Sequence, residues 1–271
     1  MDTVMIYGME TYAGFALCEK FLQEGIPVCG IYDIEGKPAV QKQFEDKMML
    51  IGRNALLEAR AWTKDFVFPD EPPSVVYCAA DGEGGIAGEE QVNALLSWAS
   101  AMELQFLLLS SLDVFGEEQL VITEETAPEP DTDRGKRLLA IEKAAAKAYS
   151  NTENRYGILR LPVLYGPGMP ADFMSDKKNP PMRGLLFISD AVSAIVKNDC
   201  SIFFRGMPLY LASERNEDMI RTAQALGHEL TITMCGQKIP NGLTIECPEV
   251  TPIEEKLSQL KNDTLLKNRM N

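Results

Sequence analysis

The 271-residue chain is long enough to bury a full hydrophobic core, and its length suits one large domain or a domain with a small appendage. With 26 Lys and Arg against 40 Asp and Glu, its net charge of −14 argues against a nucleic-acid partner. A single histidine and six scattered cysteines argue against a metal site and for free thiols in a reducing compartment. No apolar run reaches the length of a membrane span, so we expect a cytoplasmic protein without membrane contacts.

Short apolar runs alternate with helical patterns along the first part of the chain. Strands that are apolar on both faces and alternate with helices form parallel sheets covered by helices on both sides. The sequence therefore predicts an α/β fold, a Rossmann-type doubly wound parallel sheet. The expected strands span 3–7, 26–32, 47–51, 74–80, 104–110 and 157–161, and the expected helices span 15–22, 89–102 and 134–149.

The alternation of apolar runs with helical patterns is less regular in the last third of the chain. We expect a dinucleotide-binding domain at 1–165 and a small C-terminal α/β substrate region at 166–271, with the chain crossing back near 185–200. The elements expected in this part are a helix from Phe187 to Lys197 capped by Ser189 or Asp190, helices at 216–226 and 253–266, and short strands near Leu209 and Leu230.

A glycine loop, GMETYAG, follows the first expected strand. Gly8 and Gly14 match the glycines that allow a tight turn and close helix packing in a dinucleotide-binding loop. Thr11 stands at the middle glycine, where its Cβ would push a pyrophosphate outward. Glu10 adds a like charge that repels by roughly 1 to 4 kcal/mol, unless its side chain turns to solvent. The loop leaves dinucleotide binding an open question.

Asp33 ends the second expected strand and is the candidate for binding the adenosine ribose. Tyr32 is the alternative occupant, in which case Asp33 is only a turn residue. An acid at this place disfavours a 2′-phosphate, so we expect NAD or NADP as cofactor with NAD favoured. Tyr12 in the loop and Ala79 at the end of the fourth expected strand complete the expected cofactor contacts.

Later segments resemble those of the extended short-chain dehydrogenases/reductases, the NAD-dependent epimerase/dehydratase family. SSLDVFG at 110–116 is similar to the S-S-x-x-V-Y-G strand end of that family. RLPVLYGPG at 160–168 resembles its R-x-x-N-V-Y-G-P-G segment, and FISDAV at 187–192 resembles its F-V-H-V-D-D-V segment. The segments occur in the family's order, and with the glycine loop the resemblance extends to about residue 215.

The resemblance implies a Rossmann-type domain that binds NAD(P) and acts on nucleotide sugars or related carbonyl compounds. It also implies a hydroxyl that orients the substrate, which Ser111 matches, and a Tyr/Lys pair in a Y-G-x-S-K-x-x-x-E helix. In that pair the Tyr exchanges a proton with the substrate, and the Lys lowers the pKa of the Tyr and holds the nicotinamide ribose. A phenol, whose pKa is near 10, needs such a cation to act near neutral pH.

Both members of this pair are replaced in the matching helix. The segment RGKRLLAIE aligns through Gly135 and Glu142, which puts Arg134 at the tyrosine and Leu138 at the lysine. A guanidinium cannot deliver a proton near neutral pH, and leucine cannot hydrogen-bond a ribose. We therefore predict an NAD(P)-binding Rossmann-fold protein without the usual Tyr/Lys pair, which serves as a binding, regulatory, sensing or scaffold protein. The altered glycine loop allows for dinucleotide binding that is weak or lost.

The alternative is an active oxidoreductase or epimerase on a nucleotide sugar or small carbonyl compound. It would use an unusual acid such as Asp113 or Glu118 near Ser111. Arg53 also departs from the family, because it replaces an adenine-contacting Asp after the third expected strand. The acidic stretch after the fifth expected strand is interpreted as a solvated loop rather than a metal site. Its members are Asp113, Glu117, Glu118, Glu124 and Glu125.

The two long helices expected in the first domain also suggest an ion pair and a dimer interface. Arg134, Lys136 and Arg137 begin the second of them, where cations oppose the helix dipole, so we expect a neighbouring carboxylate. The helices at 89–102 and 134–149 have apolar and alanine-rich faces. In the family such helices pair across a two-fold axis, which predicts a homodimer.

Overall fold

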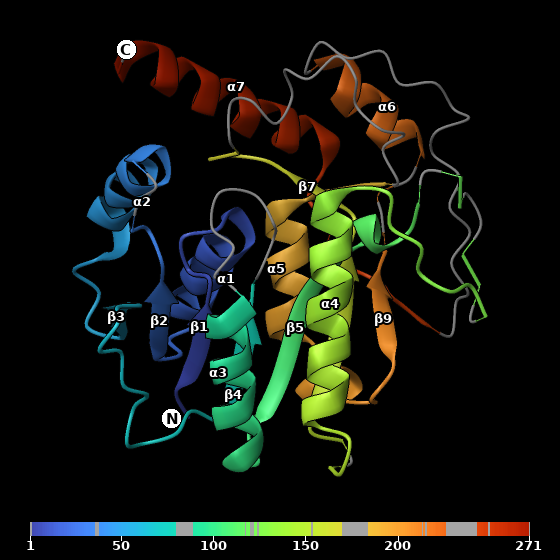
Figure 1. The fold of residues 1–271 in the computed structure, drawn as a ribbon. Coiled ribbons are helices and arrows are strands. Elements are labelled where there is room, and N and C mark those ends of the chain that lie inside the picture. The colour runs from blue at the N-terminus through green and yellow to red at the C-terminus, as the bar shows by residue number, and fades with distance from the viewer. Residues whose placement is uncertain are drawn as a thin grey trace.

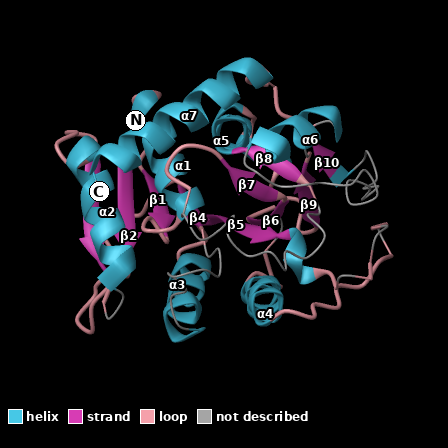
Figure 2. Cartoon of the chain, turned by 90° about the horizontal axis from the view of Figure 1, so that it is seen from above, coloured by secondary structure: helices cyan, strands magenta, loops and turns pink. Residues whose placement is uncertain are grey.

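One parallel sheet runs through the molecule and carries helices on both faces (Figures 1 and 2). The strand order of this eight-stranded sheet is β10-β9-β6-β5-β4-β1-β2-β3, and a second sheet pairs β7 with β8. The computed structural model describes residues 2–35, 38–79, 89–116, 118–119, 122–123, 125–152, 154–169, 184–212, 214, 216–225, 243–248 and 250–270.

All strand pairings within the described residues are parallel. The order from β3 through β1 to β6 reverses direction between β1 and β4, as in a Rossmann fold. This confirms the predicted doubly wound α/β fold. The strands are β1 (Val4–Tyr7), β2 (Val28–Tyr32), β3 (Leu57–Ala61), β4 (Val75–Cys78), β5 (Gln105–Ser111), β6 (Tyr156–Leu161), β7 (Val163–Tyr165), β8 (Leu185–Phe187), β9 (Pro208–Leu211) and β10 (Thr244–Ile245).

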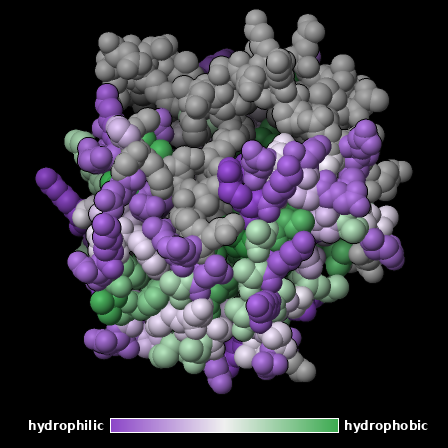
Figure 3. Space-filling view, in the orientation of Figure 1, coloured by the Kyte–Doolittle hydropathy of each residue, from purple (hydrophilic) through white to green (hydrophobic). Residues whose placement is uncertain are grey.

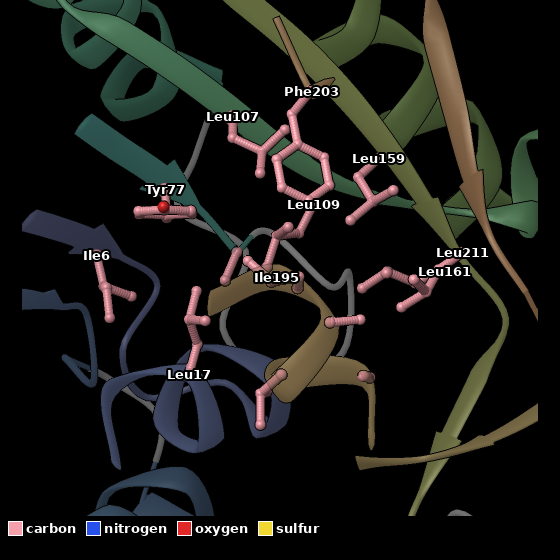
Figure 4. Close-up of a cluster of buried hydrophobic side chains, with 14 of the residues drawn as sticks. Ile6, Leu17, Tyr77, Leu107, Leu109, Leu159, Leu161, Ile195, Phe203 and Leu211 are labelled. Carbon is pink, nitrogen blue, oxygen red and sulfur yellow. The ribbon is translucent and has the colours of Figure 1, made fainter. Parts of the chain in front are cut away.

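Each face of the sheet has its own apolar core. In β1, Val4 and Ile6 pack on the side of α1 and α5, whereas Met5 and Tyr7 pack on the side of α3 and α4. Burial of both faces explains why the central strands are almost uninterrupted apolar runs. Figure 4 shows the core between the sheet, α1 and α5. The helices are α1 (Tyr12–Gln23), α2 (Pro38–Ile51), α3 (Glu89–Ala101), α4 (Asp133–Ala148), α5 (Ile188–Lys197), α6 (Asn216–Ala225) and α7 (Ile253–Met270).

The prediction of a third strand at 47–51 is wrong. Residues 47–51 form the end of α2, and the third strand is β3, which follows it. The apolar run does not lie in the core as a strand would, because Met49 and Leu50 are 81% and 78% exposed. Among the described strands β3 pairs with β2 alone, and its residues are half-buried or exposed. Its polar sequence therefore gave no apolar run by which to recognise it. The residue that follows the third strand is therefore Trp62, and the comparison made for Arg53 does not hold.

The C-terminal part joins the first domain at several places. β9 and β10 extend the main sheet beyond β6, and α5 packs against α1. The division near residue 165 stays a prediction. The strand expected near Leu230 and the acidic residues Glu117 and Glu124 lie outside the described residues. None of the helices that the structure describes is long and apolar enough to cross a membrane.

The expected N-cap of α5 is also wrong. Phe187 precedes the helix, and no side chain caps it. Asp190 is instead buried in the protein, where its carboxylate accepts the backbone N–H of Thr251 and lies 3.0 Å from the Lys256 ammonium. An aspartate near a helix start thus holds a distant segment of the chain rather than its own backbone.

Lys256 ties α7 to the rest of the protein. Its ammonium lies 2.6 Å from Glu214 Oε1, which also accepts the Tyr165 hydroxyl at 2.7 Å. Burial alone lowers the pKa of Lys256, but its contacts with Glu214 and Asp190 outweigh burial and raise it. The Lys256 ammonium therefore forms ion pairs with two buried carboxylates. The helix that carries it, α7, crosses the top of the molecule in Figure 1.

We predict that Lys256→Met lowers the free energy of unfolding by about 3–5 kcal/mol, because it leaves two buried carboxylates without their cation. The matched control is Lys261→Met at an exposed position of the same helix, with little expected effect. Urea unfolding measures both. Equal losses in the two variants would contradict the role of the buried cation.

Candidate functional site

The glycine loop lies at the carboxyl end of β1, between β2 and β4. Gly8 has a φ of 81°, and a Cβ there would lie 2.6 Å from the carbonyl oxygen of Ala79. A Cβ on Gly14 would collide with the carbonyl of Gly8. Both positions therefore require glycine, which supports the roles that the sequence assigned to them. This is the crevice in which open parallel sheets bind ligands.

Thr11 and Glu10 are both buried in this loop. The Thr11 hydroxyl caps α1 by accepting the N–H of Gly14 at 3.0 Å, so the helix begins earlier than its apolar spacing indicated. Glu10 is only 7% exposed, so the option that it turns to solvent is wrong. Its charge is close enough to help raise the pKa of Tyr7, after burial and Cys78. The Glu10 side chain therefore lies within the folded loop and not in solvent.

Asp33 follows β2 at the same edge of the sheet and is half-buried. Gln91, near the start of α3, directs its Nε2 to Asp33 Oδ2 at 3.5 Å, and its Oε1 accepts the Tyr7 hydroxyl at 2.9 Å. Tyr32, the alternative ribose residue, packs its ring on Phe44 with centroids 4.7 Å apart. The assignment of the ribose to Asp33, with Tyr32 as the alternative, stays a prediction. Sequence reasoning missed Tyr7 and Gln91.

Tyr12 and Ala79 lie beside the loop, as the sequence indicated. A Cβ on Gly166 would lie 3.1 Å from the Tyr12 hydroxyl oxygen, so the Y-G-P-G turn meets the start of α1. The Lys47 ammonium lies 5.7 Å from the centre of the Tyr12 ring. Ala79 donates its N–H to the Tyr7 carbonyl at 2.8 Å. The glycine loop, the end of β4 and the turn at 166 therefore lie side by side.

Ser111 ends β5 on the same carboxyl edge. Its hydroxyl accepts the N–H of Asp113 at 3.2 Å and caps a short 3-10 helix, Leu112–Val114. The Asp113 carboxylate forms an ion pair with Arg134 at the start of α4. This confirms the expected carboxylate beside the cations of that helix. It also means that the acid nearest to Ser111 in the chain is already bound to a guanidinium.

The register of α4 is fixed at its start. A Cβ on Gly135 would collide with the carbonyl oxygen of Asp113, so only glycine allows this approach. The Thr132 hydroxyl caps the helix by accepting the N–H of Gly135 at 3.0 Å. Arg134 directly precedes Gly135, whose backbone closely approaches the carbonyl oxygen of Asp113.

The register is fixed again two turns later by a buried ion pair. Glu142 Oε2 accepts from Arg160 Nη2 at 2.7 Å, and its Oε1 accepts the Ser110 hydroxyl at 2.6 Å. Arg160 also donates to the Tyr210 hydroxyl at 2.9 Å. Between these anchors Leu138 is 1% exposed and belongs to the apolar core.

Three phenols later in the chain, at the end of α4 and in β6 and β7, have partners of their own. Tyr149 and Tyr156 donate to the backbone carbonyls of Leu104 and Gly206. Tyr165, in the Y-G-P-G turn, donates to a buried glutamate in the cluster around Lys256. Each of these hydroxyls is held by a structural contact.

The sequence model of the NAD dependent epimerase/dehydratase family matches residues 4–186. The chain belongs to this family. This confirms the resemblance carried by the glycine loop and the segments around Ser111 and Arg160, whereas the segment at 187–192 lies just beyond the matched residues. No curated protein gives a match.

Solved structures of the same fold include enzymes that are distant in sequence. UDP-glucuronic acid 4-epimerase from Bacillus cereus, in complex with UDP-glucuronic acid and NAD, is 15% identical with a TM-score of 0.67, over 97% of this chain and 99% of that one. Yeast methylglyoxal/isovaleraldehyde reductase, complexed with NADPH, is 13% identical with a TM-score of 0.64, over 98% and 99%. At these identities the comparison establishes the fold of this epimerase/dehydratase family member.

We predict that Gly135→Ala destabilises the protein although alanine favours helices by about 1 kcal/mol. The new Cβ meets the Asp113 carbonyl, and relieving that clash costs about 1–3 kcal/mol. Arg137→Ala, at an exposed position of the same turn, is the control and is expected to change stability by less than about 0.5 kcal/mol. A thermal melt that shows Gly135→Ala to be stabilising would contradict the close approach.

Proposed function

We propose that the protein binds a nicotinamide dinucleotide, NAD in preference to NADP, and acts as a binding or regulatory protein without the family's proton relay. The proposed lack of a proton relay is supported by the fixed register of α4. The motif alignment through Gly135 and Glu142 assigns Arg134 to the tyrosine position and Leu138 to the lysine position, and the contacts of the two residues that fix the alignment with their neighbours support it.

Dinucleotide binding is supported by the geometry of the glycine loop. Gly8 and Gly14 keep the tight turn and the close helix start, and Asp33 ends β2 at the same edge. The related epimerase from Bacillus cereus holds NAD, and the yeast reductase holds NADPH. The preference for NAD rests on Asp33, because a carboxylate repels a 2′-phosphate. Thr11 and the buried Glu10 weaken the affinity.

Loss of the proton relay is supported by the partners of the two replacing residues. Arg134 pairs with Asp113, and a guanidinium stays charged at any pH at which the protein is folded. Leu138 has no polar atom with which to hold a ribose or to lower the pKa of a phenol. Ser111 therefore has a hydroxyl to offer a substrate, but the aligned positions of α4 hold no Tyr/Lys pair that could exchange a proton with that substrate.

The second candidate is an active epimerase or oxidoreductase on a nucleotide sugar or small carbonyl compound. It is supported by the place of Ser111 at the end of β5, with Asp113 two residues further along. The ion pair between Asp113 and Arg134 opposes this role, because an acid that transfers protons must first leave its guanidinium partner.

Calorimetry with NAD, NADH, NADP and NADPH separates these functions. We expect binding that favours NAD, followed by no change of the nicotinamide absorbance when UDP-glucuronic acid or methylglyoxal is added. Hydride exchange with either compound would favour the second candidate. A failure to bind any of the four dinucleotides at millimolar concentration would contradict both.

The charge of Glu10 makes a separate prediction. Glu10→Gln removes a repulsion of at least about 1 kcal/mol, so the affinity for NAD is expected to rise about fivefold or more. Glu24→Gln is the matched control, because Glu24 lies at the exposed end of α1 and pairs with Lys20. Titration calorimetry measures both. An unchanged or weaker affinity in Glu10→Gln would contradict a carboxylate directed at the pyrophosphate.

A homodimer through α3 and α4 and a cytoplasmic location complete the proposal. In Figure 3 apolar side chains lie among the charged ones on the face that carries these helices. The described cysteines Cys18, Cys29, Cys78, Cys200 and Cys247 are free thiols, which fits a reducing compartment. Light scattering at micromolar concentration is expected to give twice the chain mass of 30.0 kDa. The mass of a single chain would contradict the proposed homodimer.

A further inference from the structure

Three elements meet through a chain of hydrogen bonds at the β2 end of the candidate cleft. Tyr7 closes β1, Gln91 lies in the first turn of α3, and Asp33 follows β2. The Tyr7 hydroxyl donates to Gln91 Oε1 at 2.9 Å, and Gln91 Nε2 donates to Asp33 Oδ2 at 3.5 Å. Residues that are far apart in sequence therefore converge on one carboxylate.

The phenol determines which way the Gln91 amide points. Burial raises the pKa of Tyr7, with smaller contributions from Cys78, Glu10 and Asp33, so the hydroxyl stays protonated and remains a donor. A donor selects the oxygen of the amide and leaves its NH₂ for the other side, where Asp33 lies. The Tyr7 ring is itself buried and packs edge-on against Trp62, at 5.6 Å between centroids. The direction of this donor is thus set by packing.

The two oxygens of Asp33 are then held by different groups. Oδ1 accepts the backbone N–H of Glu35 at 3.3 Å, and Oδ2 faces the amide of Gln91. Both donors are neutral, so they orient the carboxylate without cancelling its charge. A carboxylate has sites for about four hydrogen bonds, so these two donors orient Asp33 without using all of its acceptor sites themselves. An arginine at the place of Gln91 would instead favour a 2′-phosphate.

We propose that Gln91, fixed by Tyr7, is a positioning residue that orients Asp33 toward the adenosine ribose and so sets the preference for NAD over NADP. This inference rests on the proposed dinucleotide binding. It assigns the specificity to a side chain of α3, outside the glycine loop and outside the end of β2.

The test compares the affinities for NAD, NADP and AMP in the wild type, Gln91→Leu and Tyr7→Phe. Gln91→Leu is expected to weaken NAD and AMP binding about tenfold while NADP changes less than about twofold, because only the ribose hydroxyls lose an oriented acceptor. Tyr7→Phe is expected to shift the NAD/NADP ratio in the same direction by a smaller factor. The matched control is Gln41→Leu on α2, where the side chain is exposed and donates to Glu45 Oε1 at 2.8 Å.

A merely structural role for Gln91 would lower the melting temperature and weaken all three ligands equally. The Asp33→Ala background tests this, since Gln91→Leu is expected to leave the NAD/NADP ratio unchanged once the carboxylate is gone. If the wild type binds NAD and Gln91→Leu does not alter the ratio, the inference is overturned and the proposed function stands. If the wild type binds none of the three ligands, both are overturned.

Discussion

The buried ion pair between Glu142 and Arg160 fixes how α4 lies on the sheet. Its two hydrogen bonds, together with the one from Ser110, bind the middle of the helix to β5 and β6. The close approach of Gly135 to the Asp113 carbonyl fixes the first turn of the same helix. Because a helix is rigid between two such anchors, the identity of every residue that faces the cleft follows from them. Removal of either partner would leave a buried charge uncompensated, which is strongly unfavourable.

The arrangement of the sheet was predictable because β1, β4 and β5 are buried on both faces and their sequences are correspondingly apolar. β3 could not be recognised in the same way, since it is an edge strand with charged residues at Glu58 and Arg60. The apolar run at 47–51 was misleading because only some of its side chains face the core. Asp190 suggested a helix cap, although its real partner lies on α7.

Some features of the candidate site could likewise be predicted from the sequence, and others could not. Gly8 and Asp33 directly follow strands, Ser111 ends β5, and Gly14 lies in the first turn of the helix after β1. Their meeting at one edge of the sheet therefore follows from the parallel topology. The bond from Tyr7 to Gln91 joins residues 84 positions apart and depends on the packing of α3, which no local pattern reveals. The burial of Glu10 likewise depends on its surroundings in the folded loop. A motif comparison thus locates such a cleft, whereas its charge and its donors have to come from three-dimensional contacts.

The account predicts a family member whose cleft has kept its shape and lost its proton relay. A crystal structure of the protein with NAD bound tests this most directly, because it shows which groups surround the nicotinamide ribose. We expect Arg134 and Leu138 on the side of α4, with no tyrosine hydroxyl or lysine ammonium within hydrogen-bond distance of both the ribose and Ser111. A phenol and an ammonium from another segment meeting beside Ser111 would contradict the account.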